Sequence, residues 1–140
     1  MQVVLNLRER ELEERQMEMA KILAALNEQK AKLQSIFAAQ EQNSINLEIL
    51  SSSDNMDIPQ IEMHRDYGMK LIGDAKNQER IIQNTESILQ KKQQEVFEAH
   101  KKVEVLKKLK EKQEKEYYKE FLQSEAKEID DITSARFRFQ

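Results

Sequence analysis

The sequence predicts an all-α fold: an antiparallel two-helix coiled-coil hairpin in which a long C-terminal helix overhangs its partner. Three observations indicate this fold. The 140 residues include only two glycines and one proline, and 35% of them are charged, which is typical of long helices and coiled coils. Two long segments repeat apolar residues at heptad spacing, and one short polar break separates them. The apolar surface is therefore expected to be buried along a seam between two helices.

The first helix is expected at about residues 2–50. Its best apolar row has members seven residues apart, namely Leu5, Leu12, Met19, Leu26, Leu33 and, after an interruption at Gln40, Leu47. The companion row, three residues later, is only partly apolar and reads Arg8, Arg15, Ile22, Gln29, Ile36, Asn43 and Leu50. Polar residues at seam positions lower the stability of a coiled coil and help to set its register. This helix should therefore pair with another helix through one apolar and one mixed row.

A turn is expected at about residues 51–58, where the helix signals fail. The run from Ser51 to Asn55 consists of residues whose side chains compete for backbone hydrogen bonds. Pro59 fits the first turn of a new helix, because its missing N–H is not needed there. The second helix is therefore expected at about residues 59–136.

The second helix has a heptad row of its own, formed by Ile82, Leu89, Val96 and Val103. Near its start, Gly68 and Gly73 leave two alternatives open: a continuous helix, or a short helix followed by a long one with Asp74 as its N-cap. After Leu106 the apolar phase drifts, as happens when a straight helix departs from a strict heptad. A new stripe then continues to Phe139 through Tyr118, Leu122, Ile129 and Ile132.

The second helix is longer than the first and should therefore overhang it. A turn centred near residue 55 leaves roughly 30 C-terminal residues, about 45 Å of helix, without a partner, and a longer turn would shorten this overhang. The stretch Lys107–Leu122 lies at or beyond the end of the hairpin and carries clustered aromatic residues. Tyr118, Phe121 and Leu122 therefore need either a fold-back of the chain or another protein to cover them.

The net charge of −3 is distributed unevenly along the chain. Residues 91–140 carry 13 Lys and Arg against 11 Asp and Glu, whereas the rest of the chain is acidic. We interpret the lysines of this segment as a solvated helix face with i,i+4 ion pairs, and a docking surface for an acidic partner is the alternative. Nucleic acid is not favoured as a partner, because the chain is acidic and lacks a binding motif. Tyr67 and Leu71, four residues apart near the turn, form a second candidate partner patch.

The sequence supplies no catalytic or metal-binding set. It contains no cysteine, and His64 and His100 are isolated, so we interpret them as surface or seam residues. Gly68 and Gly73 have the spacing of a phosphate loop, but Asp74 stands where a lysine is required. We therefore expect no enzyme activity, no cofactor and no metal. The longest apolar runs are too short for a signal peptide or a membrane span, so we expect a soluble intracellular protein without a transmembrane segment.

Three features of the sequence form a recognisable series: an N-terminal charged segment with the leucine row, the central polar break and, above all, a C-terminal series. The residues concerned are Leu5-x-Leu7-Arg8-Glu9-Arg10-Glu11-x-Glu13-Glu14, Leu106-x-x-Leu109-Lys110-Glu111-Lys112, Glu116-Tyr117 and Glu128-x-Asp130-Asp131-x-x-x-x-Arg136-Phe137. In these features, and over almost its whole length, the sequence resembles the FliJ family of flagellar export proteins.

This resemblance implies a non-enzymatic component of flagellar type III protein export, built like the central stalk of rotary ATPases. Such proteins sit in the pore of the hexameric flagellar export ATPase, promote its assembly and activity, link it to the membrane export gate and are described as escorting export chaperones. The resemblance also implies a cytoplasmic protein that associates peripherally with the inner face of the cell membrane at the flagellar base.

The resemblance implies two partner-binding sites, which we place on residues of this chain. Contact with the ATPase ring is expected at Lys108, Lys110, Lys112, Tyr118, Phe121 and Leu122. Contact with the cytoplasmic domain of the export gate is expected at Phe37, Tyr67 and Leu71.

Two other functions remain as alternatives to the stalk: a general export chaperone or adaptor, and a generic coiled-coil tether that dimerises. A stalk must be monomeric to fill a single pore, and we expect a monomer in isolation. A tether should self-associate through its mixed seam.

Overall fold

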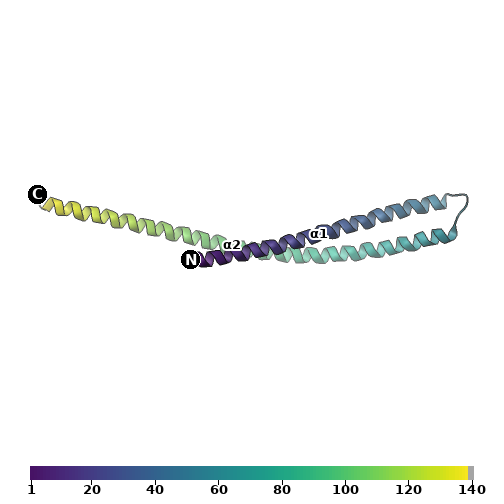
Figure 1. Cartoon of the computed structure of the whole chain (residues 1–140), viewed down its shortest axis with the longest axis horizontal. Helices are drawn as coiled ribbons and strands as arrows, with labels where there is room; N and C mark the ends of the chain where they lie inside the picture. Colours follow the sequence, from purple (N-terminus) through teal and green to yellow (C-terminus); the bar gives the residue numbers. More distant parts are fainter. Residues whose placement is uncertain (139–140) are drawn as a thin grey trace. The chain divides into compact units, whose positions relative to one another are not determined.

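The computed structural model describes residues 1–138 and contains two helices, α1 (Gln2–Ser51) and α2 (Ile58–Arg138), joined by a short turn (Figure 1). The predicted fold class is confirmed: the two long helices pack against each other, and the described residues contain no strand. The apolar stripe expected from the sequence continues to Phe139, which lies outside the described residues.

The chain divides into two compact units, which we call the turn unit and the terminal unit. The turn unit consists of Arg15–Val96, and the terminal unit combines Met1–Glu14 with Phe97–Gln140. Each unit contains part of α1 and part of α2, so each has a helix–helix seam of its own.

Capping interactions define the turn between the two helices. The Ser52 backbone N–H and hydroxyl both donate to the Glu48 carbonyl, at 3.1 and 2.9 Å, and so satisfy an acceptor in the last turn of α1. Asp57 caps α2, because its carboxylate accepts a hydrogen bond from the Gln60 N–H at 3.3 Å. Pro59 therefore falls in the first turn of α2, where a missing N–H costs nothing.

The seam of the turn unit is built from small and branched apolar side chains. Leu26 from α1 is buried with Leu71, Ala75 and Ile82 from α2. α2 is continuous through Gly68 and Gly73, so of the two alternatives the continuous helix is the one observed.

In the terminal unit the seam is short and ends before α2 does. Leu5 and Val103 are its most buried residues, at 4% and 2% exposure. Every residue from 111 to 138 is exposed, so this segment, which we call the overhang, has no partner helix within the chain. The predicted overhang is therefore present.

The overhang remains helical because of local interactions and composition. It contains no glycine or proline, and Lys115 lies 3.6 Å from Glu111 one helical turn earlier. Arg136 and Arg138 occupy its last turn, where positive charge interacts favourably with the helix dipole. Over residues 1–138, neither helix has an apolar stretch long enough to cross a membrane.

Candidate interaction surfaces

The overhang carries an apolar stripe that no part of the described chain covers. Tyr118, Phe121, Leu122, Ile129 and Ile132 recur at helical spacing and therefore lie on one face. Each is between 46% and 62% exposed, which is high for large apolar side chains on one helix face. Their spacing made this stripe predictable from sequence, and the structure adds that α1 does not reach it.

The three lysines predicted to contact a partner have unequal surroundings. Lys108 and Lys112 are exposed on α2. Lys110 is half-buried, because its ammonium group donates a hydrogen bond to the side-chain oxygen of Gln2 at the start of α1. A change at Lys110 would therefore disturb the hairpin end as well as a docking surface.

A groove lined by apolar and basic side chains lies at the seam of the terminal unit. It has a volume of about 370 Å³ and is lined by Val4, Arg8, Lys101, Lys102, Val105 and Leu106. The Lys101 ammonium group sits 4.9 Å from the centre of the Phe97 ring, a cation–π contact. Sequence reasoning did not find this groove, because it depends on which residues of the two helices lie opposite each other.

The residues expected to contact the export gate occupy different environments. Phe37 and Tyr67 are 38% and 46% exposed. Leu71, by contrast, is only 5% exposed and belongs to the seam, so it is not part of an exposed patch with Tyr67. The reason is geometric: residue 71 faces α1 directly, in register with the other seam residues Ala75 and Ile82.

Tyr67 lines a small polar groove near the turn. This groove has a volume of about 190 Å³, and its other lining residues are Ala39, Gln42, Asn43, Asn46 and His64. Phe37 does not line it. A larger groove of about 530 Å³ is lined by Gln40, Asn43, Ser44, Leu47, Arg65, Gly68, Met69 and Ile72. The larger groove was missed because Met69 and Ile72 do not belong to the heptad row.

Asn43 lines both grooves and fixes the register of the turn unit. Its amide nitrogen donates to the His64 carbonyl at 2.9 Å, and its amide oxygen lies 3.1 Å from Nδ1 of His64. Gly68 makes room for it, since a Cβ at that position would lie 2.9 Å from the Asn43 amide nitrogen. A second buried amide, Gln78, donates to the Gln29 carbonyl at 2.9 Å. Both amides fix one pairing of the helices, because any shift would leave them buried without partners.

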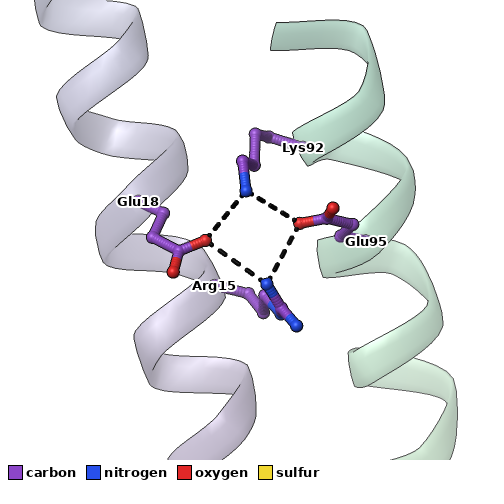
Figure 2. Close-up of polar contacts among 4 residues, drawn as sticks. All are labelled: Arg15, Glu18, Lys92 and Glu95. Carbon is purple, nitrogen blue, oxygen red and sulfur yellow. Dashed lines mark hydrogen bonds and ion pairs between the residues drawn. The ribbon is translucent and has the colours of Figure 1, made fainter. Parts of the chain in front are cut away.

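Four charged side chains form a closed square across the seam of the turn unit (Figure 2). Lys92 Nζ lies 3.1 Å from Glu18 and 3.2 Å from Glu95, and Arg15 Nη1 lies 3.3 Å from Glu95 and 3.5 Å from Glu18. The hydrogen bond from Lys92, together with its charge, lowers the pKa of Glu18. The hydrogen bonds from Lys92 to Glu18 and Glu95 raise the pKa of Lys92.

The described residues offer surfaces for partners. Within residues 1–138, no group of His, Cys, Asp and Glu side chains could hold a metal ion. His64 Nδ1 lies within hydrogen-bond distance of the Asn43 amide oxygen, and His100 is exposed. The arrangement can therefore present an apolar stripe and open grooves to other macromolecules.

These features define a class, a helical-hairpin interaction protein with an exposed helical extension. The chain belongs to the FliJ family: the family model described as flagellar FliJ protein matches residues 1–140, which confirms the resemblance inferred from sequence. No curated protein and no solved structure was found to match. The family is a non-catalytic component of flagellar export, so the chain is a flagellar export-related protein.

Proposed function

We propose that this protein is the stalk of the flagellar type III export ATPase, which inserts in the hexameric ring, promotes its assembly and activity, and links it to the export gate. The observation that carries the proposal is the overhang, a continuous helix of exposed residues from 111 to 138 with an apolar stripe. Family membership supports the export apparatus as the source of the partner.

The energetics of the stripe favour a macromolecular partner. Burying one large apolar side chain fully contributes about 1.5–3 kcal/mol, so covering the five stripe residues could offset a substantial part of the cost of association. A pore that surrounds the overhang would cover this face without requiring any rearrangement of the hairpin seam. We therefore assign Tyr118, Phe121 and Leu122 to the proposed ring contact.

Alanine substitution on the stripe tests this assignment. The double variant Tyr118→Ala/Phe121→Ala should weaken stimulation of the cognate ATPase by about tenfold, as expected for two aromatic anchors of an interface. Gln123→Ala is the matched control, because Gln123 is exposed in the same segment and its position in the helical repeat puts it on a different face from Tyr118 and Phe121. Circular dichroism should show unchanged helix content in both. Undiminished stimulation by the double variant would count against the stalk.

The basic residues require a variant set that leaves the hairpin intact. Charge reversal at Lys108 and Lys112 should weaken ATPase stimulation and reduce its dependence on salt, because these exposed cations would no longer attract an acidic surface. Lys110 is left unchanged on account of its contact with Gln2. Lys76→Glu, an exposed reversal in the turn unit, is the control for the change in net charge.

For the proposed gate contact, the informative residues are those that the seam does not bury. Phe37→Ala and Tyr67→Ala should each reduce capture of the cytoplasmic domain of the export gate in a pull-down. Leu71→Ala is unsuitable, because loss of a buried leucine would destabilise the hairpin. Ile88→Ala, another exposed apolar residue of the turn unit, provides the control. Full capture by both variants would remove this assignment.

An export chaperone or adaptor is the second candidate function, and the groove near Met69 favours it. This groove of about 530 Å³ is lined by both apolar and polar side chains, and Met69 is 73% exposed. The flexible, unbranched side chain of a methionine adapts to the shape of different partners. If this function holds, Met69→Asp should abolish binding of an export chaperone while ATPase stimulation is retained. In either case we propose a cytoplasmic location with peripheral attachment to the membrane at the flagellar base.

A further inference from the structure

The C-terminal part of α2, from residue 107 at the end of the seam into the overhang, has a charge pattern that the proposed partner does not explain. Residues 107–119 contain six lysines and three glutamates, whereas residues 120–131 contain five acidic residues and one lysine. We call these segments the basic block and the acidic block. Tyr118, Phe121 and Leu122, the densest part of the apolar stripe, lie at the boundary between the two blocks.

This pattern is complementary to itself only in the antiparallel direction. A two-fold axis near the boundary would place the basic block of one chain against the acidic block of another, and would bring the two aromatic clusters together. Such a self-complementary patch is what an isologous interface requires. Parallel packing would instead set like charges opposite each other.

Folding back within one chain cannot cover the stripe. α2 runs without a break from Ile58 to Arg138, and its two glycines lie far before the stripe, at residues 68 and 73. The stripe must therefore be covered by another molecule or remain exposed, at a cost in solubility.

We propose that, away from the export apparatus, two copies of this chain associate antiparallel through residues 107–131 of α2, with the stripe at the centre and opposite charge blocks facing each other. This proposal differs from the expectation, made from the sequence, of a monomer in isolation. The dimer would cover the same aromatic residues that the proposed ring contact uses. Unbound copies would therefore remain dimeric until a partner that binds more tightly displaces the second copy. The self-association does not depend on the proposed function.

Sedimentation equilibrium on the full chain tests the proposal without any ATPase. At low salt, the weight-average mass should rise about twofold from the lowest to the highest concentration, as expected for a reversible C2 dimer. Added salt should shift the rise to higher concentration, because exposed charges are screened. Tyr118→Ala/Phe121→Ala should remain monomeric throughout, while Gln123→Ala, on a different helix face, should behave as the wild type.

A charge exchange tests whether the charge blocks drive the association. One variant carries Lys112→Glu, Lys115→Glu and Lys119→Glu, and the other carries Glu128→Lys, Asp130→Lys and Asp131→Lys. Each variant alone should be monomeric, because both of its blocks then have one sign, while a mixture of the two should restore the dimer mass. A monomeric wild type at every concentration, or a mixture that stays monomeric, overturns the proposal and leaves the stripe to another protein.

Discussion

Asn43 and Gly68 show how one polar residue can decide the pairing of two long helices. The Asn43 amide is 5% exposed, and it is satisfied only by His64 on the opposite helix. Burial of an amide costs free energy when its partner is absent, so competing registers are penalised. The heptad rows placed Asn43 at the seam, but they could not show that a glycine faces it.

The two glycines of α2 provide a matched test of this packing. Gly68→Ala should unfold at lower denaturant concentration than Gly73→Ala, with a difference of about 1–3 kcal/mol, because the new methyl group forces Asn43 out of its hydrogen bond. A Cβ at Gly73 meets nothing within 4 Å, so Gly73→Ala should gain up to about 1 kcal/mol from helix propensity. Urea denaturation measures both, and equal stabilisation by the two changes would refute the proposed role of Gly68.

The charge square predicts how stability depends on pH. The folded pKa of Glu18 lies below its ordinary value, chiefly because of the hydrogen bond from Lys92. Its contribution is therefore present above the ordinary pKa of glutamate and is lost as the pH falls through the folded pKa. Lys92 has a raised pKa, so its contribution is present below the ordinary pKa of lysine and is lost as the pH rises through the folded pKa.

Glu18→Gln isolates the acid side of this dependence. The variant should lose less thermal stability than the wild type between neutral and acidic pH, because its residue 18 no longer has a proton to bind. The effect should be small, since these side chains are exposed to solvent. Melting temperatures across the pH range provide the measurement, with Glu28→Gln as a control. If the melting temperatures of the wild type and Glu18→Gln fell equally as the pH is lowered, a contribution of the Glu18 ion pairs to stability would be contradicted.

At the scale of the helices, the sequence was sufficient to predict both helices. It was insufficient to predict which residues of the two helices lie opposite each other. Heptad rows and the polar break predicted both helices, and a turn centred near residue 55 correctly places Glu18 opposite Lys92. The groove between Val4 and Val105 requires the pairing to be known to a single residue, and spacing rules do not reach that accuracy. Leu71 shows the same limit, since a one-residue difference in phase moves a side chain from seam to surface.

Two valines near the end of the hairpin allow the effect of losing a buried side chain to be compared with that of losing an exposed one. Val103 is 2% exposed, so Val103→Ala should destabilise the protein by about 1–3 kcal/mol. Val105 is 63% exposed on the same helix, and Val105→Ala should change stability by less than about 0.5 kcal/mol. Urea midpoints of the two variants test which residue faces α1. Similar losses at both positions would mean that the seam runs along a different face.

For the molecule as a whole, the organising feature is the difference in length between the two helices. α1 is 50 residues long and α2 is 81, so the hairpin leaves its own C-terminal segment unpartnered. The position of the turn and the lengths of the two expected helices predicted this overhang, whereas no pattern in one sequence could identify what covers it. The family places the protein in flagellar export, and the exposed stripe is where a partner gains most by binding.

The stoichiometry of the complex with the cognate export ATPase tests the stalk proposal most directly. Light scattering on the purified complex should give one copy of this chain per ATPase hexamer, and the Tyr118→Ala/Phe121→Ala variant should not join the hexamer. A complex with one copy per ATPase subunit, or full incorporation of the double variant, would contradict a stalk that occupies a single pore through its overhang.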